Sequence, residues 1–138
     1  MGVDEEATML DSRPTVVELF GGAGLFGHAF KQVGFRIVRA IEKDVVAAGT
    51  YAKNVSDDVE VADIRKLTPA GRCDVLIAGP PCQGFSTLGR RNSNDPRNRL
   101  SWEVVRWSRK LRPRVVVIEK VAAFLDSPNW RQITNAFK

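Results

Sequence analysis

The sequence predicts an α/β protein with a doubly wound, mostly parallel sheet. Short runs rich in Val and Ile alternate with stretches whose apolar residues recur at helical spacing, which is the pattern of successive βαβ units. The chain has 138 residues, 43% of them hydrophobic, so it suits one domain or part of one. Glycines and acidic residues follow several of the expected strands, and ligands bind at these C-terminal strand ends in such sheets.

The first expected elements are a strand, a turn and a helix. We expect residues 1–13 to form a mobile leader and residues 15–20 to form a short apolar strand. Residues 21–24 are rich in glycine and predict a turn. Gly34 is suited to end the helix that follows, as a C-cap. That helix repeats apolar residues at helical spacing, at Leu25, Phe26, Ala29, Phe30 and Val33.

The middle of the chain continues the alternation. Residues 35–41 alternate with period two and predict a second strand, and residues 45–53 favour a helix. A third and a fourth strand are expected over residues 59–64 and 74–78. The sequence Gly79-Pro80-Pro81 stops the fourth strand abruptly.

The last part of the chain predicts a loop, a helix, a strand and a helix. Residues 84–99 are polar and rich in Gly, Asn and Arg, so they predict a loop. Pro113 ends the next helix, and residues 114–118 predict a fifth strand. Residues 122–138 are compatible with one further helix. The core face of the helix before Pro113 is expected at Leu100, Val104, Trp107 and Leu111.

The net charge of +5 is unevenly distributed. Residues 1–69 hold 8 Lys/Arg and 11 Asp/Glu, whereas residues 70–138 hold 13 and 5. The densest basic stretch, residues 90–114, suits a polyanion such as nucleic acid, and a solvated helix face explains it equally well. No apolar run reaches the roughly 20 residues of a membrane helix, so no membrane partner is expected. Cys73 and Cys82 make no disulfide framework, which favours a reducing cytoplasm.

Two strand ends suit a nucleotide-type cofactor. The turn Phe20-Gly-Gly-Ala-Gly24 lets a ligand approach the backbone, although a glycine turn is often only a helix-packing device. Glu42, at the end of the next strand, could accept hydrogen bonds from ribose hydroxyls. At the third strand end, Asp63 could accept from an adenine amino group and Ile64 could pack on its ring. Asp63 could equally be the N-cap of the next segment.

Two further strand ends suit catalysis. Cys82 follows a double proline, a setting that favours a nucleophile over an inert packed cysteine, whereas Cys73 is expected to be structural. Glu119 ends the fifth strand, next to the fourth in a simple winding, so its carboxyl could face Cys82 across a cleft. An acid directly after the apolar residues 115–118 needs a partner or a function to offset desolvation. A salt bridge with Lys120 is the alternative.

From about residue 16 to residue 124, the chain resembles the N-terminal part of the DNA (cytosine-5) methyltransferases. Gly79-Pro-Pro-Cys-Gln-Gly-Phe-Ser86 matches the catalytic motif of this family. This match is highly specific, because amino-methylating DNA enzymes have Pro-Pro-Tyr or Pro-Pro-Phe instead. The other matched motifs are residues 18–24, Glu42, the adenine-binding pair Asp63-Ile64, residues 95–100 and Glu119-Lys-Val121, which corresponds to Glu-Asn-Val.

The resemblance implies a Rossmann-like, S-adenosylmethionine-dependent fold, incomplete at the C-terminus, that methylates carbon 5 of a cytosine flipped out of DNA. Cys82 would add to carbon 6, and Glu119 would hydrogen-bond the ring N3 and the exocyclic amine. No metal is expected. The implied cofactor residues are Phe20, Gly22, Ala23, Gly24, Glu42, Asp63, Ile64, Gly79, Pro81 and Leu100. DNA contacts are implied for Gln83, Ser86, Arg90, Arg91 and Arg97, with the stretch 90–114 holding the backbone.

Three positions depart from the family pattern. Glu18 stands where the family usually has Asp, Leu25 replaces the last glycine of the first motif, and Lys120 replaces an asparagine that helps to hold the catalytic loop. The family's later arginine motif, target-recognition domain and final cofactor-pocket segment are also missing from the sequence. DNA as a partner implies a bacterial cytoplasm or a eukaryotic nucleus, and restriction-modification and regulation both fit.

Three interpretations follow. The chain is one part of a split or truncated methyltransferase, in which a second chain could supply the missing motifs. Alternatively, it is a catalytically inactive cofactor- or DNA-binding module of the same fold. The third interpretation is an unrelated nucleotide-binding protein that uses Cys82 for other chemistry.

Overall fold

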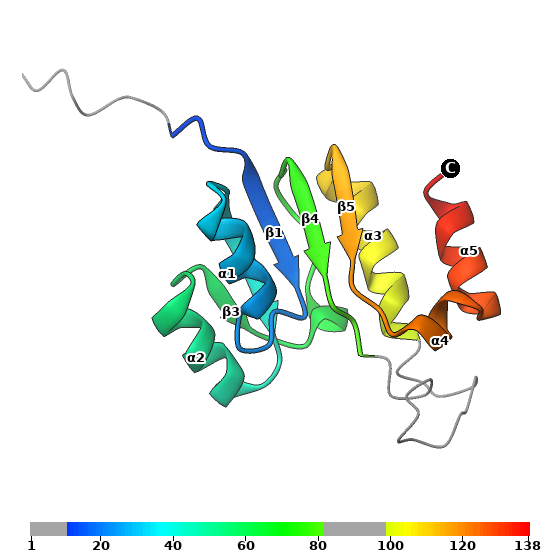
Figure 1. Ribbon diagram of the computed structural model, residues 1–138, viewed down its shortest axis with the longest axis horizontal. Helices are drawn as coiled ribbons and strands as arrows, with labels where there is room; N and C mark the ends of the chain where they lie inside the picture. The colour runs from blue at the N-terminus through cyan, green and yellow to red at the C-terminus, as the bar shows by residue number, and fades with distance from the viewer. Residues whose placement is uncertain (1–10, 82–98) are drawn as a thin grey trace, which may run out of the picture.

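The computed structural model describes residues 11–81 and 99–138, and Figure 1 shows how its elements are arranged. The expected leader therefore lies mostly outside the described residues. Within them, five strands form one parallel sheet: β1 (Thr15–Leu19), β2 (Arg36–Glu42), β3 (Val59–Val61), β4 (Val75–Ala78) and β5 (Val115–Ile118). The helical elements are α1 (Leu25–Gln32), α2 (Val45–Asn54), the 3₁₀ turn η1 (Ile64–Lys66), α3 (Ser101–Leu111), α4 (Ala122–Leu125) and α5 (Pro128–Ala136).

Helices cover both faces of the sheet (Figure 1). On the face of α1 and α2, Tyr51 packs with Ile77 in one apolar cluster, and on the face of α3, Trp107 packs with Leu76 in another. The strand order is β3-β2-β1-β4-β5, all parallel, and it reverses between β1 and β4. Ligands bind at such a reversal in open α/β sheets. The predicted doubly wound, parallel α/β fold is therefore confirmed.

The apolar character of β1 follows from its central place. Val16 and Val17 point to opposite faces, belong to the two different clusters, and are both buried. A strand covered on both faces is apolar throughout rather than alternating. The neighbouring helices begin and end where the sequence predicts: Asp44 caps α2 by accepting the N–H of Ala47 at 2.8 Å, and Gly34, with φ +95°, follows α1.

The third predicted strand is too long. β3 ends at Val61 instead of continuing to residue 64. Asp63 turns the chain away from the sheet, because its side chain accepts the N–H of Arg65 at 3.1 Å and caps η1. A local side-chain hydrogen bond here competes with strand pairing.

The single helix expected over residues 122–138 is wrong, since α4 and α5 are separate. Ser127 caps α5 by accepting the N–H of Trp130 at 3.2 Å, and Pro128 occupies its first turn. These are start signals for a new helix. Every other predicted strand or helix agrees with the structure to within one residue at each end. Among the described segments, no helix combines the length and the apolar character that crossing a bilayer requires.

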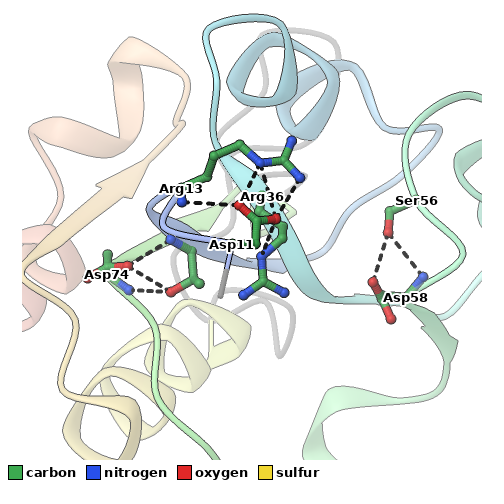
Figure 2. A network of polar contacts seen from close by, with 7 residues as sticks. Asp11, Arg13, Arg36, Ser56, Asp58 and Asp74 are labelled. Atoms are coloured by element: carbon green, nitrogen blue, oxygen red, sulfur yellow. Dashed lines mark hydrogen bonds and ion pairs between the residues drawn. The ribbon is translucent and has the colours of Figure 1, made fainter. Parts of the chain in front are cut away.

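Polar contacts connect the segments at the N-terminal ends of the parallel strands. Asp74, just before β4, accepts the backbone N–H and the hydroxyl of Thr15 at 2.7 and 2.9 Å. These bonds hold the pKa of Asp74 below its ordinary value. Nearby, the Asp11 carboxylate contacts Arg13 at 2.7 Å and Arg36 at 3.2 Å (Figure 2). Each contact is partly or fully exposed, so it aligns the start of β1 more than it stabilises the fold.

Candidate functional site at the C-terminal edge of the sheet

A cavity of about 540 Å³ lies where four parallel strands end. Such edges gather side chains from segments far apart in the sequence. The lining residues are Phe20 and Gly22 after β1, Ile41, Glu42 and Lys43 at the end of β2, Ala62, Asp63, Ile64 and Arg65 after β3, Gly79 and Pro81 after β4, and Leu100 before α3. The cavity is therefore built by the fold rather than by one local motif.

Glu42 holds the glycine turn that follows β1. Its Oε2 accepts the N–H of Gly22 at 2.7 Å, and its Oε1 accepts the N–H of Asp44 at 2.7 Å. Gly22 has φ +55°, a conformation that glycine adopts without strain, and Phe20 has φ +61°. A non-glycine residue in this region costs about 1–3 kcal/mol, and such strain concentrates at functional sites. One carboxylate thus joins the ends of β1 and β2 at the cavity wall.

Asp63 is the N-cap of η1 and also lies at the wall of the cavity. The N-cap alternative is therefore confirmed, and the buried Ile64 lines the cavity beside Asp63. The Arg65 guanidinium contacts the Asp63 carboxylate at 2.6 Å. Hydrogen bonds from Arg65 hold the pKa of Asp63 well below its ordinary value, so this carboxylate stays ionised. Arg65 already bonds this carboxylate through its backbone N–H, Nε and Nη2, so about one of its roughly four acceptor sites remains for a ligand donor.

The ends of β4 and β5 bring Glu119 next to the double proline. Ala78 pairs with Ile118, and a Cβ on Gly79 would lie 3.6 Å from Glu119 Oε2. Glu119 is exposed, so the expectation that this acid must offset desolvation is wrong. The reason is that β5 is an edge strand of the described sheet, not a buried central one.

Lys120 ties the end of β5 to the double proline. Its Nζ donates to the carbonyl oxygen of Pro80 at 3.0 Å and lies 4.3 Å from the centroid of the Phe124 ring. The residue that departs from the Glu-Asn-Val motif therefore contacts the backbone just before Cys82 in the sequence.

Over residues 14–138, the sequence matches the family described as C-5 cytosine-specific DNA methylase. The chain belongs to this family. It is 40% identical over 118 residues to the type II methyltransferase M.DdeI of Desulfomicrobium norvegicum, which covers 80% of this chain and 28% of that protein. It is 32% identical over 128 residues to the type II methyltransferase M.AquIA of a Picosynechococcus species, covering 83% of this chain and 50% of that protein.

A solved methyltransferase has the same fold. The crystal structure of S. pombe Dnmt2 methyltransferase superposes with a TM-score of 0.73 at 27% identity, over 90% of this chain and 41% of that one. The resemblance inferred from the motifs is confirmed, and the interpretation as an unrelated nucleotide-binding protein is excluded. The chain spans 28% of the length of M.DdeI and 50% of that of M.AquIA.

The cavity contains eight of the ten residues expected to hold the cofactor. The two that it does not contain are Ala23, which is exposed, and Gly24, which packs toward Val55 and Tyr51 of the neighbouring helix. Cys82 and the residues expected to contact DNA lie outside the described residues; the latter are Gln83, Ser86, Arg90, Arg91 and Arg97.

Four residues that line the cavity were not predicted from the sequence: Ile41, Lys43, Ala62 and Arg65. Each is an immediate or near neighbour of Glu42 or Asp63 at a strand end. A rule that extends every strand-end motif by one or two residues would have found them. Lys43 and Arg65 also add positive charge beside the two acids, which the motifs do not indicate.

The described part of the basic stretch, residues 99–114, does not form one surface. Arg106 is structural, because its guanidinium donates to the carbonyl oxygens of Leu67 at 2.9 Å and Ile64 at 2.8 Å. Arg114 donates its N–H to Asp74, so this end of the stretch lies where β4 and β5 start. Residues 109–112 thus lie at the edge of the sheet opposite the cavity. That end includes Arg109, Lys110 and Arg112, which line a second cavity of about 560 Å³ with Gly71 and Arg72.

Proposed function

We propose that this chain is the catalytic N-terminal part of a DNA (cytosine-5) methyltransferase that uses S-adenosylmethionine. The observation that carries the proposal is the meeting of three features at one edge of the sheet. The cavity with Glu42 and Asp63 opens there, Pro81 lines it directly before Cys82 in the sequence, and Glu119 lies beside Gly79. This chemistry requires a nucleoside pocket, a nucleophile and an acid, and in the sequence Cys82 directly follows a residue of the cavity wall.

The residues of the cavity suit S-adenosylmethionine. Glu42 would accept hydrogen bonds from the ribose hydroxyls, and Asp63 would accept from the adenine amino group. Ile64 and Leu100 supply apolar contact for the adenine ring. The volume of about 540 Å³ lies within the usual range of small-molecule sites. When bound, S-adenosylmethionine supplies an electrophilic methyl group.

Two side chains of the chain itself activate the cytosine. Carbon 5 is a poor nucleophile, and addition of the Cys82 thiolate to carbon 6 gives it enamine character. Glu119 would hydrogen-bond N3 and the exocyclic amine, which stabilises the charge that develops on the ring. Its exposed carboxyl is accessible to an incoming base. Once carbon 5 has accepted the methyl group, loss of the proton from that carbon and elimination of the thiolate from carbon 6 restore Cys82 and the aromatic ring.

The proposal includes a further polypeptide, either a C-terminal continuation or a second chain. β5 forms an edge of the described sheet, Val115 is 51% exposed, and residues 116–118 are only half-buried. Edge strands of this apolar kind are normally paired or covered. Together with the 28% coverage of M.DdeI, this favours a missing part that covers β5 and reads the DNA sequence. The origin of M.DdeI and M.AquIA favours a bacterial cytoplasm and restriction-modification.

Covalent trapping tests the proposal. The purified chain is mixed with S-adenosylmethionine and DNA that contains 5-fluorocytosine, from which the fluorine cannot leave as a proton does. A covalent adduct is expected that Cys82→Ser abolishes and Cys73→Ala retains, since Cys73 is a buried thiol whose pKa burial raises to about 11. An adduct that forms only after a C-terminal partner is added indicates a split enzyme. A Cys82→Ala variant that still methylates DNA would refute the assignment.

A catalytically inactive binding module is the second candidate. Two departures from the family pattern favour it. Lys120 stands where the family has asparagine, and Leu25, whose side chain is 87% exposed, stands where the family has glycine. This candidate predicts that the chain binds S-adenosylhomocysteine but forms no adduct, even with a C-terminal partner present. Calorimetry and trapping on the same preparation separate the two candidates.

A further inference from the structure

A buried carboxyl group lies directly behind the glycine turn. Glu18 is in the centre of β1 and only 2% exposed. Its cross-strand neighbours are Ala40 on β2 and Ile77 on β4, which offer no charge. Its polar contacts come from the two helices on this face: Tyr51 Oη donates to Oε2 at 2.5 Å, and the N–H of Gly27 donates to Oε1 at 3.2 Å. A buried acid needs such partners to offset its desolvation.

The contact with α1 requires a glycine. A Cβ on Gly27 would overlap Glu18 Oε2 and would lie 2.5 Å from the Tyr51 hydroxyl. Both side chains are buried and bonded to each other, so neither can move aside without breaking that bond. The longer acid at position 18 therefore fits only because position 27 has no side chain. The two residues are matched in size.

The contact with α2 reaches the glycine turn. A Cβ on Gly21 or on Gly24 would lie 3.0 Å from the Tyr51 ring. The ring therefore packs directly against the backbone of the turn. Glu42, which lines the cavity, accepts the N–H of Gly22, so the turn contacts both this carboxylate and the buried aromatic ring.

We propose that Glu18, Gly27 and Tyr51 form a positioning unit that sets the shape of the glycine turn and thereby the affinity for the nucleoside cofactor. Glu18 fixes the Tyr51 ring through the hydroxyl, and the ring fixes the turn through contact with Gly21 and Gly24. None of the three residues lines the cavity, so the unit acts on the ligand indirectly, through the backbone of the turn. The inference rests on the proposed function, because it assigns the cavity to that cofactor.

Size-matched variants test the unit in the full chain. Gly27→Ala is expected to weaken binding of S-adenosylhomocysteine by about tenfold or more, and Tyr51→Phe by several-fold, since the hydroxyl no longer fixes the ring. Shortening the acid relieves the overlap with Glu18 Oε2 but not the close contact with the Tyr51 hydroxyl, so the double variant Glu18→Asp/Gly27→Ala is expected to recover part of the affinity lost in Gly27→Ala. Gly49→Ala is the matched control, because a Cβ on Gly49 of α2 meets nothing within 4 Å.

A spectroscopic readout separates positioning from general stability. The amide NMR shifts of Gly21, Gly22 and Gly24 are expected to move in Gly27→Ala and Tyr51→Phe, to return toward wild type in the double variant, and to stay unchanged in Gly49→Ala. This readout needs no ligand, so it tests the unit even if the wild-type chain binds no S-adenosylhomocysteine, a result that would instead count against the proposed function. Unmoved turn amides in folded Tyr51→Phe, or no recovery in the double variant, would overturn the inference.

Discussion

Replacing Glu42 by alanine tests the central contact of the proposed cofactor site. In the structure both carboxylate oxygens are engaged, with the N–H groups of Gly22 and Asp44 at 2.7 Å each. The substitution removes both acceptors at once. It also removes the group that we expect to bind the ribose hydroxyls, so the change acts on the turn and on the ligand together.

The size of the effect follows from the kind of bond that is lost. A hydrogen bond to a charged group contributes about 1.5–3 kcal/mol when buried, and Glu42 is half-buried, so solvent replaces part of it. We expect a loss of about 1–3 kcal/mol in cofactor binding, which is roughly 5- to 150-fold in the dissociation constant. We also expect the free energy of unfolding to fall by about 1 kcal/mol, because Gly22 and Asp44 lose their acceptor.

Calorimetric titration with S-adenosylhomocysteine measures the affinity, and urea unfolding measures the stability. Glu60→Ala is the matched control: Glu60 lies on the adjacent strand, bonds only the side chain of Arg39 at 2.6 Å, and does not line the cavity. Its affinity is expected to equal that of wild type. If Glu42→Ala binds S-adenosylhomocysteine within twofold of wild type while remaining folded, the carboxylate does not meet the ribose and the cavity is not the nucleoside pocket.

Three further predictions concern other contacts. Lys120→Met removes the hydrogen bond to the Pro80 carbonyl. We expect the single-turnover rate of methyl transfer to fall about tenfold, with the affinity for S-adenosylhomocysteine unchanged within twofold. Equal losses of rate and affinity would contradict a role confined to the double proline. Arg106→Ala removes donors to two backbone carbonyls and is expected to reduce the free energy of unfolding by about 1–3 kcal/mol. The control is Arg109→Ala, at an exposed residue of the same helix, which is expected to change the free energy of unfolding by less than about 0.5 kcal/mol. Similar values for the two variants in urea unfolding would refute the structural role of Arg106. Burial raises the pKa of Glu18 from 4.5 to about 7, so the folded chain binds this proton more tightly than the unfolded chain. The resulting stabilisation is complete below pH 4.5 and is lost as the pH rises through about 7, by at most about 3 kcal/mol. Urea unfolding at pH 5 and pH 8 checks the sign: Glu18→Gln is expected to lose less stability than wild type over this interval, and an equal loss would be inconsistent with a buried, titrating Glu18.

Several features of this protein could be predicted from its sequence because they depend on local chemistry. Helical spacing and period-two alternation predict most helix and strand bounds, since each element buries one face or both. The double proline before Cys82 and the glycines of residues 20–24 mark strand ends, because these residues restrict or release the backbone. Such signals, with the specificity of the catalytic motif, were sufficient for the fold class and the family.

Other features were decided by the tertiary structure, because they depend on the order of the strands and on which side chains meet. The sequence does not indicate that Tyr51 reaches Glu18, since these residues are 33 positions apart and come together only when α2 packs on β1. Nor does it show that Arg109 and Arg112 lie at the opposite edge from Glu42, because a run of like charges carries no direction until its helix is placed. The prediction that Glu119 must offset desolvation was wrong for the same reason. Whether an acid after an apolar strand is buried depends on what lies beside that strand, and here β5 is an edge of the described sheet.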